Sequence, residues 1–283
     1  MQQLSAEHQG KAFAVDDGDL RMMYLNEQCM QSAMRISAPA ELLCAYSRVM
    51  MSSLLLTPEP QEIGIIGFGG GSIAKYVRHH LPTCKIRALE IREDVMALRE
   101  QFAVPPDDLY LQVIHTDAAD YIPTCNEPVD LLFLDAYDKN GLVAALNTPD
   151  FYAHCHRLLK PGGTLVANVW GKPSALAPML SSLQQLFDGQ TGFCRSPDSY
   201  NLLVFATKGT ISPTLLGERA DQLQTRHPTL SFSLCRQAIE KTHTILGQDA
   251  ILQYLRSVLV EDGSVPQDYA EWKSLVLAIL AQE

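Results

Sequence analysis

Residues 63–80 read IGIIGFGGGSIAKYVRHH and combine three local patterns. A short apolar run is followed by a glycine cluster, and the glycines open onto a segment typical of a helix. A strand, a tight glycine turn and a helix in this order begin many nucleoside-binding α/β domains. Because the glycine pattern fits NAD, FAD and S-adenosylmethionine alike, the stretch predicts the fold and leaves the ligand open.

Strands and helices alternate after this stretch. We expect strands at 63–68, 85–91, 109–117, 129–137, 164–170 and 200–207, and helices at 72–81, 92–102, 148–163 and 174–187. The strands are almost continuous apolar runs, which indicates a parallel sheet covered by helices on both faces. The sequence therefore predicts an α/β fold with a Rossmann-like, doubly wound and mostly parallel sheet.

Different patterns flank this unit. Residues 11–25 contain two short apolar runs around an Asp-Gly turn, which predicts a β-hairpin, and residues 39–56 have a helical period. Beyond about residue 209 the period is helical, without a clear strand. We therefore expect an N-terminal hairpin and helix at 1–60, a ligand-binding domain at 61–208 and an all-α appendage at 209–283.

Composition limits the classes of function. The chain has 283 residues and a net charge of -10, so it is a poor partner for nucleic acid, whose phosphates need Lys and Arg. The charge suits a cationic substrate, although solubility alone is the simpler interpretation. No apolar run reaches the ~18 residues of a membrane span. The N-terminus lacks a signal-peptide pattern, and the seven cysteines form no CxxC pair. We therefore expect a cytoplasmic protein that binds neither nucleic acid nor membrane.

Ligands of a doubly wound sheet bind beyond the carboxyl ends of its strands. The first expected strand ends in the glycines Gly67, Gly69 and Gly71. The second ends at Glu90, whose carboxylate can accept hydrogen bonds from both hydroxyls of a ribose. The third ends at Asp117, followed by Ala118. Asp117 has two open interpretations, recognition of an adenine amino group and capping of the next helix.

The fourth expected strand ends in Asp-Ala-Tyr-Asp, residues 135–138. Asp135 and Asp138 at the mouth of a crevice can deprotonate an amine nucleophile or hold a cationic donor, and Tyr137 can add a hydroxyl. Turn formation is the alternative interpretation of both acids. Trp170, at the end of the fifth strand, is expected in the core, with a position lining the site as the alternative.

These residues together resemble the spermidine synthase family over roughly residues 10–208. The segments IGIIGFGGG, ALEI, HTDAADYI, VDLLFLDAYD and LLKPGGTLVANVW carry the resemblance. It implies that the glycine turn, Glu90, Asp117 with Ala118, and Asp135 bind S-adenosylmethionine or its decarboxylated form, without a metal.

The resemblance also implies roles around the reaction itself. Asp135 and Asp138 match the catalytic pair, in which the first acid takes the proton from the attacking amine. Tyr46 is the third catalytic residue that the resemblance implies. Gln31, Tyr46 and Tyr137 match segments that contact the acceptor, an amine or another small nucleophile. N-terminal hairpins of this family often take part in dimers, so a homodimer is an open expectation.

Several positions depart from the family pattern. Gly70 stands where the family usually has an Asp that pairs with the ammonium of the aminopropyl donor. Ser47 and Arg48 replace a His and a Glu, and Lys139 replaces a Pro; the two added cations would repel a polyamine. These changes favour methyl transfer from S-adenosylmethionine, as in spermidine synthase-like methyltransferases. Aminopropyl transfer to a diamine is the alternative, and a non-catalytic nucleoside-binding module is the third hypothesis.

Overall fold

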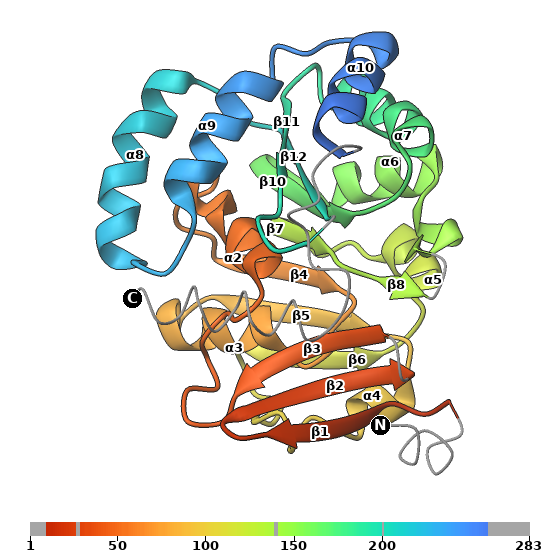
Figure 1. Cartoon of the computed structure of the whole chain (residues 1–283), viewed down its shortest axis with the longest axis vertical. Coiled ribbons are helices and arrows are strands. Elements are labelled where there is room, and N and C mark those ends of the chain that lie inside the picture. Colours follow the sequence, from red (N-terminus) through yellow and green to blue (C-terminus); the bar gives the residue numbers. More distant parts are fainter. Residues whose placement is uncertain (1–9, 27–28, 139–140, 200, 260–283) are drawn as a thin grey trace.

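A computed structural model describes the chain except for residues 1–9, 27–28, 139–140, 200 and 260–283 (Figure 1). Its main sheet contains β4 (Glu62–Ile66), β5 (Lys85–Glu90), β6 (Leu111–His115), β7 (Val129–Leu134), β10 (Leu159–Val169), β11 (Thr191–Arg195) and β12 (Leu202–Thr207). The spatial order is β11-β12-β10-β7-β4-β5-β6. Parallel pairing joins β10 through β6, whereas β12 runs antiparallel to both its neighbours. The predicted Rossmann-like, mostly parallel sheet is therefore confirmed.

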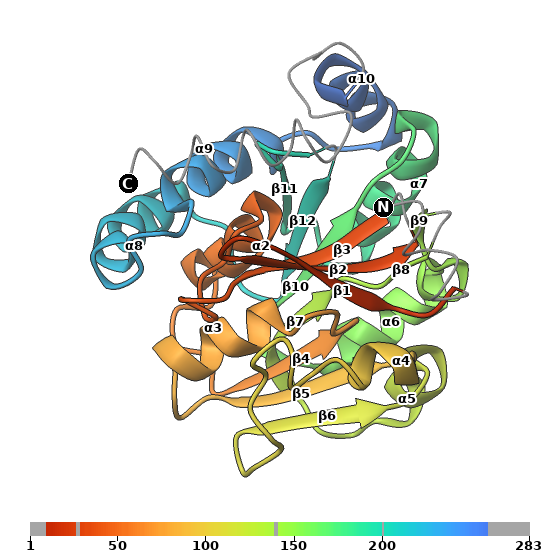
Figure 2. The same cartoon turned by 60° about the horizontal axis from the view of Figure 1, so that its bottom comes forward.

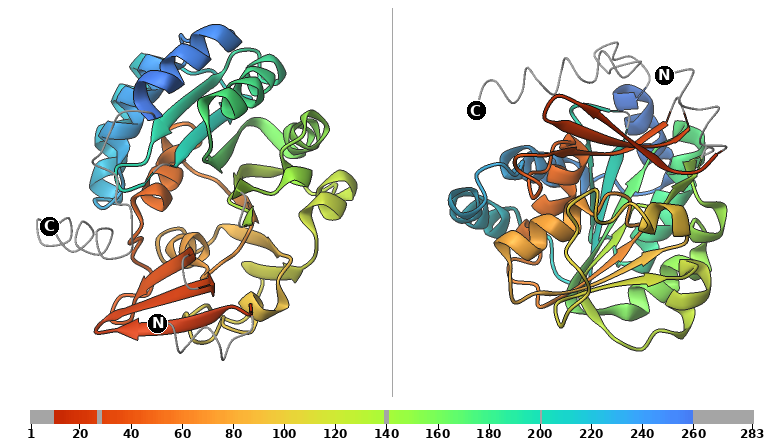
Figure 3. Two further views of the ribbon diagram at one scale, coloured as in Figure 1. Left: turned by 45° about the vertical axis from the view of Figure 1, so that its right-hand side comes forward. Right: turned by 90° about the horizontal axis from the view of Figure 1, so that it is seen from below.

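Helices cover both faces of this sheet, as Figures 2 and 3 show. They are α3 (Ser72–His80), α4 (Glu93–Met96), α5 (Ala118–Thr124), α6 (Pro149–Leu158) and α7 (Pro173–Leu186). Successive side chains of a strand enter different cores: Leu131 and Phe133 pack with α3, whereas Leu132 and Leu134 pack with α5, α6 and α7. This two-sided burial explains why the strands are apolar without alternation.

The order of the strands changes direction at the end of β4. The chain adds β5 and β6 on one side of β4 and then places β7 on the other side. The backbone N–H of Asp135 donates to the carbonyl of Ile66 at 2.8 Å, and that of Gly67 donates to Leu89 at 3.0 Å. Three strand ends are thus tied together at the point where such sheets bind ligands.

The N-terminal region is a three-stranded antiparallel sheet of β1 (Phe13–Asp17), β2 (Leu20–Asn26) and β3 (Cys29–Arg35). The hairpin expected at 11–25 corresponds to β1 and β2, with Gly18 in the turn at a φ of 62°. The third strand was not predicted. The expected helix at 39–56 is shorter, with α2 (Ala45–Met51) followed by the 3-10 turn η1 (Ser52–Leu55).

Two other helices end earlier than the sequence indicates. The helix expected at 92–102 is only α4, and the segment after it forms turns that lead to Ala103 at a φ of 52°. The helix expected at 148–163 ends at Leu158, and Pro161 and Gly162 lie within β10. Gly162 has a φ of 76°, which leaves the helical region. The end of the expected strand 129–137 is separate: Tyr137–Asp138 (β8) pairs with Gly141–Leu142 (β9), before the short η2 (Ala144–Leu146).

The predicted C-terminal helices are present as α8 (Pro213–Arg226), α9 (Phe232–Thr242) and α10 (Gln248–Leu259). Leu216, Phe232 and Ile239 of α8 and α9 share one apolar core with Ile63 of β4. Helix α10 packs against α7 on the other face. No helix in the described part of the chain is both long enough and apolar enough to span a membrane.

Candidate active site

The glycine turn between β4 and α3 has a backbone that only glycine adopts readily. Gly67, Gly69 and Gly71 have φ angles of 88°, 52° and 68°. A Cβ on Gly67 would overlap the backbone oxygen of Asp135, and one on Gly71 would lie 2.8 Å from the ring of Phe68. Gly67 therefore lets the turn pass directly beside the end of β7, and Gly71 leaves room for the Phe68 ring.

Glu90, at the end of β5, lies beside this turn and is only 8% exposed. Its Oε2 accepts hydrogen bonds from the backbone N–H groups of Phe68 at 3.1 Å and Gly69 at 3.3 Å, and its Oε1 accepts from Arg92 at 2.9 Å. The three donors satisfy most of the acceptor positions of this buried side chain. A carboxylate has about four acceptor positions, so about one remains for a ribose hydroxyl, and the role of Glu90 toward both hydroxyls stays a prediction.

Asp117 caps helix α5. Its Oδ1 accepts a hydrogen bond from the backbone N–H of Ala119 at 2.8 Å. Ala118, the first residue of the helix, is buried. The structure thus bears out the capping interpretation, while contact with an adenine amino group stays a prediction for Asp117 and Ala118.

Asp135 follows β7 and is held by two side chains from other elements. The Nδ2 of Asn168, in β10, donates to Asp135 Oδ1 at 2.8 Å. The hydroxyl of Tyr46, in α2, donates to the same carboxylate. Burial raises the pKa of Asp135 to about 6, and the two hydrogen bonds lower it against that rise. The carboxylate is therefore a stronger proton acceptor than an exposed aspartate and is still mostly ionised near neutral pH.

Two amides that support this carboxylate were not predicted. Asn168 is 2% exposed, and its Oδ1 accepts a hydrogen bond from Asn201 Nδ2 at 2.7 Å. The sequence did contain a signal for Asn168, which is a polar residue in the otherwise apolar strand of residues 164–170. Nothing local distinguishes Asn201.

Strand β3 lies against the glycine turn. The N–H of Gly70 donates to Ser32 Oγ at 2.9 Å. A Cβ on Gly70 would lie 2.9 Å from both Ser32 Cβ and Phe102 Cδ1, so a larger residue at Gly70 requires Ser32 or Phe102 to shift. Gln31, next to Ser32, is half-buried, and its contact with an acceptor stays a prediction.

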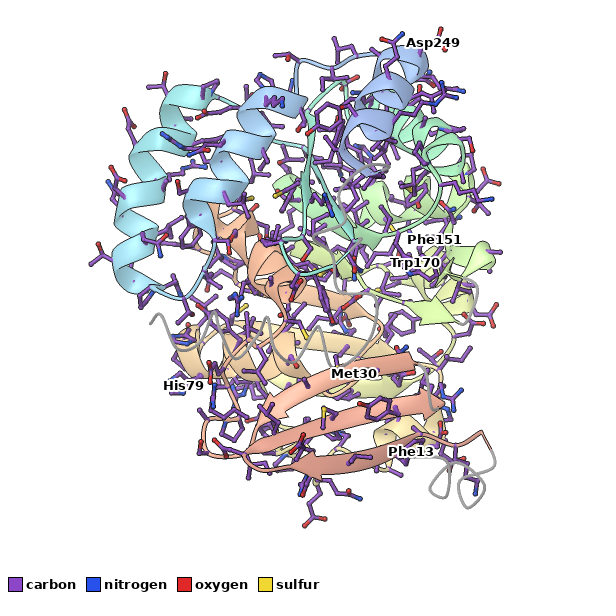
Figure 4. All side chains as sticks on the ribbon, viewed as in Figure 1. Phe13, Met30, His79, Phe151, Trp170 and Asp249 are labelled. Carbon is purple, nitrogen blue, oxygen red and sulfur yellow. The ribbon has the colours of Figure 1, made fainter. Side chains whose placement is uncertain are left out.

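Arg48 does not project freely into the crevice, as the expected repulsion of a polyamine requires. The side chain is 8% exposed, and its Nη1 donates to the carbonyls of Leu42 at 2.9 Å and Leu43 at 3.1 Å. These bonds hold residues 42–43 outside helix α2, which explains why the expected helix begins late. Trp170, labelled in Figure 4, is 43% exposed, so its expected place in the core was wrong.

The other expected site residues remain predictions. The side chains of Tyr137 and Asp138, and the whole of Lys139, lie outside the described part of the chain. The role of Asp138 as partner of Asp135 is therefore untested. Among the described residues, no group of three or more His, Cys, Asp and Glu side chains is arranged to hold a metal ion.

Two comparisons with known sequences agree with each other. The profile of the spermine/spermidine synthase domain matches residues 43–197. The polyamine aminopropyltransferase of Chromobacterium violaceum is 32% identical over 215 residues, which cover 75% of this chain and 82% of that protein.

Solved structures show the same fold. A probable spermidine synthase from Corynebacterium glutamicum superposes with a TM-score of 0.65 and 18% identity, over 75% of this chain and 83% of the other. Human methyltransferase-like protein 13, solved in complex with SAH, gives a TM-score of 0.56 and 20% identity, over 71% and 92%. At these identities the structures support the fold alone.

Proposed function

Because the chain belongs to the spermine/spermidine synthase family, we propose that it transfers an aminopropyl group from decarboxylated S-adenosylmethionine to a small amine. The chain is a transferase, as its relatives are. A relative named polyamine aminopropyltransferase supports this choice over methyl transfer, which the sequence alone favoured.

The observation that carries the proposal is the raised pKa and the hydrogen bonding of Asp135. A half-buried carboxylate whose pKa is raised by desolvation to about 6, held by Tyr46 and Asn168, is suited to accept a proton from an ammonium or amine at neutral pH. A base of this kind is needed for attack by an amine, because only the neutral amine has a lone pair to donate.

The proposed step is a displacement at carbon. Asp135 removes a proton from the acceptor, and the nitrogen lone pair forms a bond to the methylene carbon attached to sulfur. The carbon–sulfur bond breaks and its electron pair stays on sulfur, which removes the sulfonium charge and releases methylthioadenosine. Glu90 and the glycine turn would hold the nucleoside of the donor at the end of β4, so that much of the rate comes from proximity.

Methyl transfer is the second candidate, and Gly70 is the observation in its favour. The position offers no carboxylate to a donor ammonium, and Ser32 and Phe102 occupy the adjacent space. A buried ammonium without a partner is costly. The two candidates therefore differ in which donor the same crevice accepts.

Calorimetric titration with both donors separates the candidates. We expect decarboxylated S-adenosylmethionine to bind at least about tenfold more tightly than S-adenosylmethionine, a difference of ~1.4 kcal/mol. Mass spectrometry after incubation with putrescine should then show an added aminopropyl group. Preference for S-adenosylmethionine with methylated product would establish the second candidate, and binding of neither donor would leave the non-catalytic hypothesis.

Asp135→Asn is the matched test of the base. Donor affinity should survive, because Glu90 and the glycine turn are intact, whereas turnover should fall by at least about 100-fold. Asp221→Asn, on the exposed side of α8, removes the same charge elsewhere and should leave turnover unchanged. Equal turnover of Asp135→Asn and the wild type would remove Asp135 from the mechanism.

We also propose the cytoplasm as the compartment and a small-molecule amine as the partner. All the described cysteines are free thiols, and most are buried, as suits a reducing environment.

A further inference from the structure

Hydrogen bonds connect three side chains from neighbouring segments of the main sheet, and the last of the three is Asp135. Asn201 Nδ2 donates to Asn168 Oδ1 at 2.7 Å, and Asn168 Nδ2 donates to Asp135 Oδ1 at 2.8 Å. The three residues belong to neighbouring segments: Asn201 directly precedes β12, Asn168 lies in β10 and Asp135 follows β7. The antiparallel register of β10 and β12, with Asn168 opposite Leu203, brings Asn201 to the end of β10.

The hydrogen bonds between these three side chains have a defined donor-to-acceptor direction. An amide has one acceptor side and one donor side, and the donor of Asn201 occupies the acceptor side of Asn168. The NH2 group of Asn168 must then face Asp135. Asn168 is 2% exposed, so bulk water cannot readily replace either partner. If the amide were reversed, its carbonyl would face the carboxylate and its NH2 would face another NH2.

We propose that Asn201 is a positioning residue for Asp135, acting through Asn168 by fixing which side of the Asn168 amide faces the carboxylate. A donor facing the carboxylate favours its ionised form, whereas a carbonyl disfavours it. The catalytic meaning of this arrangement rests on the proposed function, but the arrangement itself does not. Asn201 therefore sets the proton affinity of a group that it does not touch.

Other ionisable groups lie near Asp135, and their contacts must be unchanged in any variant used as a test. Tyr46 donates to Asp135 from α2, and the Cys44 thiol before that helix interacts electrostatically with Asp135, Asp198 and Arg48. Asp198 is anchored by the backbone N–H of Ala45 at 2.7 Å and by its own neighbour Ser196. None of these contacts includes the side chain of Asn201.

The test is a titration of Asp135 in the free, full-length protein. Carbon-13 NMR of aspartate-labelled protein reports each carboxyl, and Asp135→Asn assigns the signal. Asn201→Leu removes the donor without adding charge, and we expect the pKa of Asp135 to rise by ~0.5 unit or more, about threefold in proton affinity. Asn201→Asp turns the donor into an acceptor and should raise the pKa by ~1 unit or more, because the amide of Asn168 reverses.

Control variants distinguish an effect transmitted through Asn168 from simpler effects. Asn126→Asp adds the same charge at an exposed position and should leave the pKa of Asp135 unchanged. A rise in Asn201→Asp without one in Asn201→Leu would mean a bare charge effect and would overturn the proposal, as would no change in either variant. Asn201→Ala replaces Asn201→Leu if the latter does not fold. Since the readout is not activity, failure of the proposed reaction would leave this result intact.

Discussion

At the scale of single residues, Asp135 is placed for reactivity at a cost in stability. Burial raises its pKa to about 6, so the folded chain holds the Asp135 proton more tightly than the unfolded chain, whose aspartate has a pKa near 3.8. The folded state is thus favoured by this group at low pH, and that contribution is lost as the pH rises through about 6. At pH 8 a charged carboxylate is held where a neutral group would be more stable.

We therefore expect Asp135→Asn to stabilise the protein while it inactivates it. The shift of about two units corresponds to at most ~3 kcal/mol, and we expect a gain in the free energy of unfolding of ~1–2 kcal/mol at pH 8. The gain should shrink toward pH 4, where Asp135 is neutral in the folded chain. Urea unfolding at the two pH values measures both quantities, and a loss of stability at pH 8 would contradict the prediction.

At the scale of elements, α9 protects the edge of the main sheet. Strand β11 is an edge strand, which would leave backbone groups open to pairing with another chain. Thr242 Oγ1 accepts from the Phe193 N–H at 2.8 Å, and its single proton lies within hydrogen-bond distance of two carbonyls, that of Ala238 at 2.7 Å and that of Phe193 at 3.1 Å. Gly192 permits this approach, since a Cβ there would lie 3.0 Å from Ile239 Cγ2 and 3.2 Å from its Cα. Helix α9, which lies outside the residues matched by the family profile, thus satisfies backbone groups at the open edge of β11.

Replacing Thr242 by Val tests this contact. The change keeps the shape of the side chain but leaves the buried N–H of Phe193 without its partner, so we expect a loss of ~1–2 kcal/mol in the free energy of unfolding. Thr225→Val on α8 is the control, because among the residues that the structure describes the Thr225 hydroxyl bonds only to the carbonyl of Asp221 in its own helix. It should change stability by less than ~0.5 kcal/mol. Equal losses in the two variants would show that Thr242 does not support β11.

At the scale of the whole molecule, the C-terminal helices and the sheet share their cores. Helices α8 and α9 pack with β4 and α3 on one face, and α10 packs with α7 on the other. Arg219 adds hydrogen bonds to the carbonyls of Leu55 and Leu56 at 2.9 and 3.2 Å. The helices therefore have little apolar core of their own apart from the sheet.

We expect one cooperative unfolding transition for residues 10–259 as a consequence. Hydrogen exchange followed by mass spectrometry in increasing urea should show α9 and β12 losing protection at the same concentration. Loss of α8 and α9 at a clearly lower concentration would instead mark them as an independent unit, in agreement with the appendage that the sequence indicated.

Local patterns were sufficient to predict the fold and to place several candidate site residues at one edge of the sheet. Apolar runs that alternate with helical segments indicate a parallel sheet, and such sheets bind ligands at their carboxyl edge. Gly67, Glu90, Asp117 and Asp135 could be placed at that edge because each directly follows an apolar run. Periodicity failed where side chains or glycines redirect the backbone, as at Gly162 and at the turn held by Arg48.

The supporting contacts were decided only by the tertiary structure. Asn168 lies 33 residues from Asp135 and 33 from Asn201, and Ser32 lies 38 residues from Gly70. Such pairs depend on strand order and register, which arise from the packing of the complete sheet and leave no periodic trace along the chain. The sequence therefore predicts which carboxylate stands at the crevice, whereas the packed sheet determines which groups hold it and how tightly it binds a proton.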